Sequence, residues 1–512
     1  MRRRTSVIGL AVLSAVTVSV GLIPLGTTSA SAAACTAGTE FDFNGDGIRD
    51  TAVADPLATV NGAERAGLVR VILGGGKGIA QVSQATAGMS ATPETGDHFG
   101  FSMATYDADA DGCTDLVVGA PYEDITQDGT DLVDAGAVYV IHGTTSGIGA
   151  GSTINGYSQQ AFDASTVTEA YDWFGYALEA GKTSSSKPFL AIGVPGENVG
   201  DVTDAGGIHY AQGTTKTTVT QNSAGVTGTA EAHDRFGYSL AATPRYFAVG
   251  VPGEAIGDRT FAGGVGVFSH TIAGDAPTML AGLDQDASGI SGAAEHGDGF
   301  GTAIALLAYR PSGATSESDA LLAIGTPNED IGTTADAGMV QTLRIPASGA
   351  YTEIETIDHS TVDVLGEPMA GVFFGQRVAL ANTSPGSVGT ATNLKLAVAV
   401  PGHDTAGSIE AGAVHVLPAL GAPGTGDKLL TRGDGILPGI AGVRDFTGMG
   451  LSASATDLYV GVPYGKASGE AKGTVFVVPW STVGGGSSAV KTLKPGADGV
   501  PDEGQAFGSV IQ

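Results

Sequence analysis

The sequence feature that most constrains the fold of this chain is an internal repeat whose two ends are out of phase. Each copy begins with Phe-Gly, passes through a loop into a short apolar run that ends in a Gly-x-Pro-type turn, and then reaches an Ala-Gly-x-Val run. The first turn proline, Pro56, has no Phe-Gly before it, and the last pair, Phe507-Gly508, has no proline turn after it. A closed ring in which the two chain ends complete one shared unit accounts for both leftovers.

The repeat occurs seven times by either marker. The Phe-Gly pairs are Phe99-Gly100, Phe174-Gly175, Phe236-Gly237, Phe300-Gly301, Phe374-Gly375 and Phe507-Gly508, with Phe446 followed by Gly448 as a looser copy. The turn prolines are Pro56, Pro121, Pro195, Pro252, Pro327, Pro401 and Pro463. Successive prolines lie 57 to 75 residues apart. This spacing predicts one radial array, although a chain of 512 residues would otherwise suggest about three domains.

The apolar runs have the length of strands, and no sustained helical stripe interrupts them. The 81 glycines and 22 prolines punctuate these runs as turns. A fainter polar stretch before each Phe-Gly brings every unit to four strands. We therefore predict an all-β fold, a seven-bladed β-propeller of four-stranded antiparallel blades, closed by pairing of the C-terminal AFGSVIQ with the N-terminal segment 41–56.

The first 34 residues have the pattern of a secretory signal, with three arginines, an apolar run and the small-residue tract TTSASAAA. We predict that residues 1–34 are a removed signal peptide and that residues 35–512 form a single propeller domain of a secreted protein. A permanent anchor is the alternative, because the apolar run approaches membrane-spanning length. A lipoprotein attached through Cys35 is a further alternative, but the Leu or Val expected three residues before the cysteine is missing.

The charge of the chain is strongly acidic. Removal of the signal leaves 21 Lys and Arg against 53 Asp and Glu, a net charge of about -32. Such a field repels nucleic acid and anionic lipid surfaces, and the lysines and arginines form no cluster. We expect no nucleic-acid partner, no stable membrane span in the mature form, and a monomer.

Two acidic loops have the spacing of metal ligands. Alternate residues of a tightly turning loop point at one centre, and hard oxygen ligands in this number suit Ca²⁺ rather than zinc or copper. The candidate ligands are Asp42, Asn44, Asp46, the Ile48 carbonyl and Asp50 in the first loop, and Asp107, Asp109, Asp111, the Cys113 carbonyl and Asp115 in the second. An acidic turn without an ion is the alternative. The other five units lack such a loop, which favours structural calcium that tethers two adjacent blades; a regulatory role stays open.

Only two cysteines are present, Cys35 and Cys113. Cys35 precedes the first acidic loop and Cys113 lies inside the second, so they belong to neighbouring units. In an oxidising compartment we expect them to form a disulfide; two unpaired buried thiols are the alternative.

The Phe-Gly and Gly-Ala-Pro signatures, as in HFG and VVGAP with DADADGCTD between them, resemble the FG-GAP repeat family. This is the repeat of the N-terminal β-propeller of integrin alpha chains and of many secreted bacterial proteins. The resemblance covers nearly everything after the signal. It implies a seven-bladed propeller with calcium loops between the first two strands of a blade, and a role in extracellular binding or adhesion.

Further acidic residues follow the turn prolines and are expected to rim one face, as a solvated loop surface or as a surface that attracts partners or cations. They are Glu123 and Asp124, Glu197 and Asp201, Glu254 and Asp258, and Glu329 and Asp330, with His403 and Asp404 at the sixth turn. The tripeptide Arg432-Gly433-Asp434 matches an integrin-recognition sequence, but triplets of this kind arise by chance in long chains.

No catalytic motif occurs, and Ser239 in GYSLA lies at a repeat position rather than in a nucleophile elbow. We expect a secreted, calcium-stabilised, non-catalytic module that binds an extracellular protein or glycan. The first alternative is an extracellular hydrolase or lyase with carboxylates in the central channel. The second is a purely structural surface protein.

Overall fold

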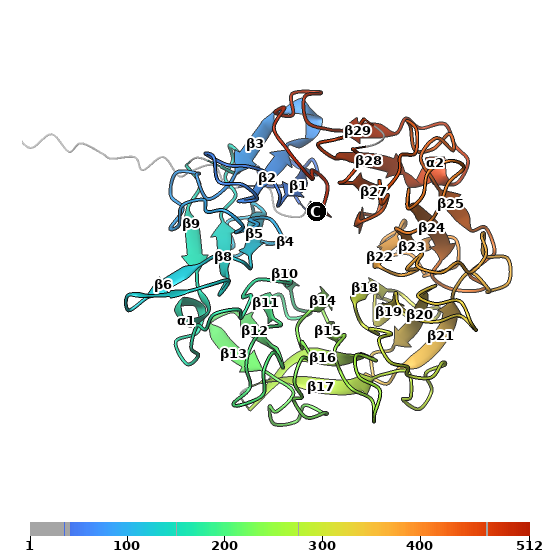
Figure 1. Ribbon diagram of the computed structural model, residues 1–512, viewed down its shortest axis with the longest axis horizontal. Helices are drawn as coiled ribbons and strands as arrows, with labels where there is room; N and C mark the ends of the chain where they lie inside the picture. The colour runs from blue at the N-terminus through green and yellow to red at the C-terminus, as the bar shows by residue number, and fades with distance from the viewer. Residues whose placement is uncertain (1–34, 36–40, 150, 275, 467–468) are drawn as a thin grey trace, which may run out of the picture.

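The computed structural model describes residue 35 and residues 41–149, 151–274, 276–466 and 469–512. Within them, seven four-stranded antiparallel sheets stand around a central axis (Figure 1). This confirms the predicted all-β, seven-bladed propeller. The predicted signal peptide, residues 1–34, lies outside the described residues.

Each blade runs from an inner strand beside the axis to an outer strand at the rim. Blade 1 contains β30 (Val510–Ile511), β1 (Thr51–Asp55), β2 (Leu68–Ile72) and β3 (Ile79–Val82); blade 2 contains β4 (Ser102–Tyr106), β5 (Asp115–Ala120), β8 (Ala137–Ile141) and β9 (Ile154–Tyr157); blade 3 contains β10 (Leu178–Lys182), β11 (Pro188–Val194), β12 (Gly207–Gln212) and β13 (Thr215–Val219); blade 4 contains β14 (Ser239–Ala242), β15 (Tyr246–Val251), β16 (Gly264–Ala273) and β17 (Ala276–Leu283).

The remaining blades follow the same order. Blade 5 contains β18 (Ala303–Tyr309), β19 (Asp319–Thr326), β20 (Met339–Ile345) and β21 (Thr352–Ile357); blade 6 contains β22 (Arg377–Asn382), β23 (Leu394–Val400), β24 (Ala413–Pro418) and β25 (Lys428–Leu430); blade 7 contains β26 (Gly450–Ala453), β27 (Asp457–Val462), β28 (Thr474–Pro479) and β29 (Lys491–Leu493). A hairpin of β6 (Ile125–Gln127) and β7 (Thr130–Leu132) projects from blade 2, and the short helices are η1 (Gly74–Gly76), α1 (Gln159–Phe162) and α2 (Trp480–Val483).

The ring closes as predicted, because the C-terminal strand belongs to the first blade. β30 pairs with β1 in antiparallel register, with Val53 opposite Ile511. Gln512 and Ala52 exchange two backbone hydrogen bonds of 2.9 Å. The chain ends thus satisfy strand edges that would otherwise stay open.

The hydrophobic core is divided into layers that lie between neighbouring blades. Six of the seven layers contain the phenylalanine of a Phe-Gly pair. The second strand of a blade is buried on both faces, as in β5 and β19, so its sequence is continuously apolar rather than alternating. The repeat is therefore the sequence signature of an interface between blades.

Close backbone contacts between neighbouring blades explain why the Ala-Gly run of the repeat requires glycine. The Phe N–H of one blade donates to the residue before the Ala-Gly glycine of the preceding blade, for example Phe174 to Ala135 over 3.0 Å and Phe507 to Lys472 over 2.9 Å. A Cβ on Gly136 would lie 2.4 Å from the Phe174 carbonyl oxygen. Only glycine permits so close an approach of two backbones.

The seventh Phe-Gly-like position differs from the prediction by one residue. Thr447, which is fully buried, makes the backbone contact that phenylalanine makes elsewhere, with its N–H donating to the Ala411 carbonyl over 2.9 Å. Phe446 precedes it with a positive φ of 48°, as Trp173 does before Phe174 with a φ of 57°. The looser copy is thus a Thr-Gly unit, because the backbone contact does not require an aromatic side chain.

The described helices are too short to cross a membrane.

Candidate functional site

The two acidic loops lie side by side, each in front of the second strand of its blade. The first precedes β1 and the second joins β4 to β5. The Thr114 N–H donates to the Asp42 carbonyl over 2.9 Å, and the Asp42 N–H donates to the Thr114 hydroxyl over 3.1 Å. The loops of blades 1 and 2 are therefore joined directly, as the tether hypothesis requires.

The disulfide between Cys35 and Cys113 reinforces this junction and confirms the predicted pairing. Cys35 lies against Gly45 of the first loop, where a Cβ would overlap the cysteine. Cys113 occupies the seventh position of the second loop. The cross-link therefore spans both loops.

Both loops turn in the same way. The side chain at position three or five accepts the N–H two residues later, as Asp46 does from Ile48 over 2.8 Å and Asp111 does from Cys113 over 2.8 Å. The sharp bends fall at Gly47 and Gly112, with φ values of 84° and 92°, where glycine is favoured. The carbonyls of Ile48 and Cys113 stay predicted ligands.

The ninth-position aspartates hold the backbone of the blade. Asp50 accepts N–H groups from Phe43 and Gly74 over 2.8 and 2.7 Å. Asp115 accepts those of Ala108 and Gly143 over 2.7 and 2.9 Å. Burial raises the pKa of Asp50 to about 6. These two side chains fix the loops to the neighbouring strands whether or not they also bind an ion.

The second loop fits a hard cation. Ligand atoms of Asp107, Asp109 and Asp111 lie within 4.8 Å of one another. One oxygen of Asp107, Oδ1, is buried and accepts no hydrogen bond, while Oδ2 lies 3.0 Å from the Lys182 ammonium. A buried carboxylate oxygen without a donor is suited to a metal ligand.

The first loop is more self-contained. Asp42 accepts the N–H groups of Asp46 and Gly47 over 3.0 and 2.7 Å, and Asn44 accepts that of Asp46 over 3.1 Å. Asp46 Oδ2 lies 2.9 Å from the Lys77 ammonium, whose hydrogen bond lowers the pKa of Asp46. In the second loop, three carboxylates therefore lie close together. In the first loop, the side chains of Asp42 and Asn44 instead accept hydrogen bonds from the loop backbone.

The axial channel lies beside the second loop. Its volume is about 690 Å³, and its wall consists mainly of small and apolar side chains from the inner strands β4, β10, β14, β18, β22 and β26. Asp107 and Glu179 are the carboxylates of the described lining. Burial raises the pKa of Glu179 to about 8.

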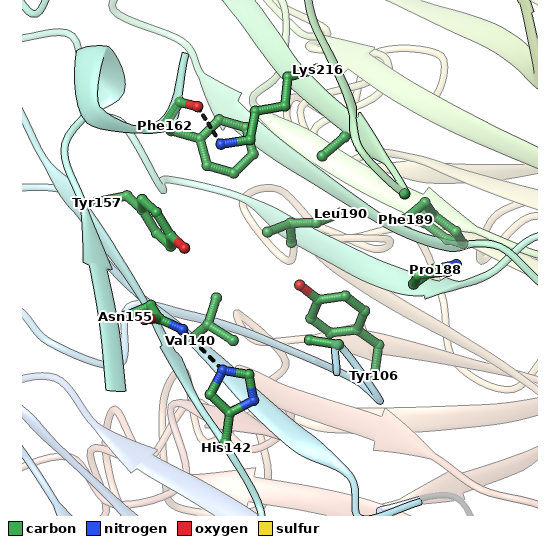
Figure 2. A pocket seen from close by; sticks show the side chains of 13 residues that line it. Tyr106, Val140, His142, Asn155, Tyr157, Phe162, Pro188, Phe189, Leu190 and Lys216 are labelled. Carbon is green, nitrogen blue, oxygen red and sulfur yellow. Dashed lines mark hydrogen bonds between the residues drawn. The ribbon is translucent and has the colours of Figure 1, made fainter. Parts of the chain in front are cut away.

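A second hollow lies between blades 2 and 3 and shares Tyr106 and Phe189 with the lining of the axial channel. It measures about 240 Å³, and Figure 2 shows aromatic side chains around it. Tyr106, Tyr157, Phe162 and Phe189 supply rings, and the hydroxyls of both tyrosines point into the space. Sequence reasoning missed this pocket, because its residues come from separate strands of two blades.

Polar groups at the two ends of the pocket are held in place. The Lys216 ammonium donates to the Phe162 carbonyl over 2.5 Å and lies 4.4 Å from the Phe162 ring centroid. His142 contacts Asn155 over 2.9 Å through Nε2 and Asp115 over 3.2 Å through Nδ1. His142 therefore connects the pocket wall to the second acidic loop.

The acidic residues after the turn prolines divide into two sets, and the expectation of a shared solvated rim is wrong for the glutamates. Glu123 and Glu329 are buried, and Glu197 and Glu254 are half-buried. Each accepts a hydrogen bond from a glutamine of the preceding blade, as Glu329 does from Gln285 over 2.7 Å. Burial, followed by Asp97, raises the pKa of Glu123 to about 9. The exposed members are Asp124, Asp201, Asp258, Asp330 and Asp404.

The Arg432-Gly433-Asp434 tripeptide is not presented as an adhesion motif. The Arg432 side chain is 2% exposed, and its guanidinium lies 3.6 Å from carboxylate oxygens of both Asp445 and Glu470. The arginine instead contributes to the interface between blades 6 and 7. The tripeptide therefore agrees with a sequence match that arose by chance.

A family model described as the FG-GAP repeat matches residues 99–141, which run from the Phe-Gly pair of blade 2 to the end of β8. Among solved structures, the chain is similar to a crystal structure of a protein from Bacteroides fragilis NCTC 9343 that is provisionally named a 6-phosphogluconolactonase. The two are 9% identical with a TM-score of 0.43, and the match covers 93% of this chain and 99% of that chain. At these values the likeness carries no argument about activity.

Proposed function

We propose that this chain, a seven-bladed β-propeller that carries an FG-GAP repeat, is a secreted, calcium-stabilised, non-catalytic module that binds an extracellular glycan or protein. Secretion is proposed from the signal pattern of residues 1–34. Asp107, Asp109 and Asp111 would hold the ion, since their oxygens converge and one of them lacks a donor.

The observation that carries the binding proposal is the pocket between blades 2 and 3 (Figure 2). Aromatic faces pack against the apolar face of a sugar ring or against an apolar side chain. Tyr157 and Lys216 add hydrogen-bond donors at the edge of those rings, which gives the few placed polar groups of a ligand site. A glycan terminus is the ligand class that this mixture suits best.

The test is a glycan array and a pull-down from culture medium with the mature protein, each with and without a chelator. We expect a ligand that Tyr157→Ala and Lys216→Ala both lose, while Tyr351→Ala, outside the pocket, keeps it. Capture of the same ligand by all three variants would place recognition elsewhere and contradict the pocket assignment. Loss of binding in chelator alone would show that the calcium loop supports the site.

The alternative, a hydrolase or lyase that acts in the axial channel, has one observation in its favour. Burial raises the pKa of Glu179 to about 8, which favours a protonated carboxyl that can donate a proton near neutral pH. Turnover of a glycoside or lactone panel by the parent protein, abolished by Glu179→Gln, would establish this alternative. Turnover unaffected by the substitution would exclude Glu179 as its acid.

A further inference from the structure

The junctions between blades contain a recurring trio of polar side chains. A glutamine two residues after the outer strand of one blade meets a glutamate two residues after the turn proline of the next blade, and an aspartate two residues before the Phe-Gly phenylalanine completes the set. The four Gln–Glu–Asp junctions are Gln84–Glu123–Asp97, Gln159–Glu197–Asp172, Gln221–Glu254–Asp234 and Gln285–Glu329–Asp298.

One amide N–H of each glutamine and one oxygen of each aspartate already take part in hydrogen bonds. The glutamine Nε2 donates to the glutamate, over 2.5 Å from Gln159 to Glu197 and 2.7 Å from Gln285 to Glu329. One oxygen of each aspartate accepts the backbone N–H of the residue three positions earlier, over 2.6 Å in all four junctions. None of these bonds uses the glutamine Oε1 or the second oxygen of the aspartate.

These acceptors are buried without partners. The Oε1 atom of each of the four glutamines accepts no hydrogen bond. These glutamines are nevertheless buried, with exposed fractions of 2%, 0%, 5% and 1% for Gln84, Gln159, Gln221 and Gln285. The Oδ1 atoms of Asp172 and Asp234 are unpartnered in the same way. The Gln84 amide also faces the Asp97 carboxyl. A buried oxygen without a hydrogen-bond donor is unfavourable, so its repetition at four equivalent places indicates a missing partner.

The carboxyl groups at these junctions also lack cationic side-chain partners. Within the described residues, no lysine or arginine forms an ion pair with any of the eight carboxylates. The nearby titratable groups are mostly further acids, Glu94 and Asp124 at the first junction, Glu169 at the second, Glu231 and Asp284 at the third, and Glu295 and Asp330 at the fourth, with His233 and His296 beside the third and fourth aspartates.

The next two junctions show what happens when the glutamine is replaced. Between blades 6 and 7, Arg432 stands two residues after β25, in the glutamine position, and its guanidinium pairs with Asp445 in the aspartate position. Between blades 5 and 6, His359 takes the glutamine position, while Val372 and His403 replace both acids. Where an acid is present at a junction, the glutamine position holds either an arginine, which is a cation, or a neutral glutamine, which offers an oxygen. Where both acids are absent, the glutamine position holds a histidine.

We infer that each Gln–Glu–Asp junction binds one hard metal cation of the Ca²⁺ class between two blades, with the glutamine Oε1, the glutamate and the second aspartate oxygen as ligands. Carbonyl and carboxylate oxygens are the ligands that Ca²⁺ takes. The cation supplies the charge that Arg432 supplies between blades 6 and 7. These sites are separate from the acidic loops and join blades 1 to 5 in series.

The experiment counts bound Ca²⁺ by equilibrium dialysis with elemental analysis, using the mature protein in which Asp107, Asp109 and Asp111 are replaced by asparagine. This background removes the carboxylates proposed to bind Ca²⁺ in the second loop. Any change in bound Ca²⁺ among the variants therefore reports on the junctions and not on that loop, so failure of the loop proposal and failure of this inference are distinguishable. In it we compare Glu329→Gln, Gln285→Arg, which copies the arrangement of Arg432, and the control Asp330→Asn at the exposed neighbouring position.

We expect Glu329→Gln and Gln285→Arg each to bind one Ca²⁺ equivalent fewer than the background, and Asp330→Asn to bind the same number. Gln285→Arg is expected to retain the melting temperature of the calcium-loaded background, so a lost equivalent cannot be attributed to unfolding. The inference is overturned if neither variant changes the number of bound ions. It is also overturned if the junctions take up protons but no Ca²⁺, because protons alone would then balance the carboxyl pairs.

Discussion

Asp55 and Ala506 are 451 residues apart in the sequence and are joined by a hydrogen bond of 2.9 Å from the Ala506 N–H to the Asp55 carboxylate. The other oxygen of Asp55 accepts the Gln505 N–H over 2.8 Å. The buried Arg70 adds a hydrogen bond of 2.6 Å to the Glu503 carbonyl. One side chain of β1 and one of β2 therefore hold the returning C-terminal segment in blade 1.

Asp55→Ala is expected to open the ring at this point. It leaves the buried Ala506 N–H and the partly buried Gln505 N–H without acceptors, and we expect a loss of about 2–4 kcal/mol in the free energy of unfolding. Chemical denaturation measures the loss, and limited proteolysis locates it near residues 503–512. Asp201→Ala, in an exposed loop, is the control. A C-terminus equally protected in both variants would contradict the role of Asp55.

The glycine of the Gly-x-Pro turn predicts a steric effect. A Cβ on Gly193 would lie 2.1 Å from the Gly237 carbonyl oxygen of the next blade, so Gly193→Ala must push two blades apart. We expect a loss of about 1–3 kcal/mol, measured by thermal unfolding. The chain offers a matched control at Ala399, where the equivalent residue is already alanine. Ala399→Gly should cost no more than about 1 kcal/mol, and a larger effect there than at Gly193 would refute the argument.

The disulfide predicts a large contribution to stability. Cys35 and Cys113 close a loop with a sequence separation of 78, for which the chain-entropy model gives about 4 kcal/mol. The double variant Cys35→Ser, Cys113→Ser should therefore unfold at lower denaturant concentration than the parent. Reduction of the parent protein should reproduce the shift. Free thiols in the secreted parent, detected by labelling, would remove the basis of the prediction.

Calcium should stabilise the joined loops. Without an ion, the close carboxylates of Asp107, Asp109 and Asp111 repel one another, so we expect millimolar Ca²⁺ to raise the melting temperature relative to chelator. In Asp107→Asn this increase should be smaller, whereas Asp128→Asn at an exposed position should behave as the parent. Identical melting of the parent in Ca²⁺ and in chelator would count against calcium binding.

The buried His209 predicts sensitivity to acid. Burial lowers its pKa to about 4, whereas in the unfolded chain the value is about 6.5. The unfolded chain therefore binds a proton first, and stability falls as the pH decreases from about 6.5 to 4, by at most about 3 kcal/mol. The free energy of unfolding of His209→Asn should depend less on pH across this interval. Parallel pH profiles for parent and variant would show that His209 is not responsible.

Local sequence determined most of the architecture of this protein. The Phe-Gly, Gly-x-Pro and Ala-Gly signals mark where the backbones of adjacent blades touch, so their number and their phase at the chain ends predicted seven blades and the closure by β30. The spacing of Asp107, Asp109 and Asp111 likewise predicted their convergence, because alternate residues of one tight turn face one centre. The Phe-Gly signal placed the seventh copy at Phe446, one residue too early. The backbone contact is made by Thr447, which stands where the other copies have phenylalanine.

The tertiary structure decided which side chains from distant segments meet. Glu123 follows a turn proline like an ordinary solvated acid, and only the docking of blade 1 against blade 2 places Gln84 above it and removes it from water. The pocket between blades 2 and 3 brings Tyr106 and Lys216 together from strands of separate blades. A repeat encodes the contacts made in every unit, whereas the partners of an individual polar side chain depend on which residue the neighbouring blade presents.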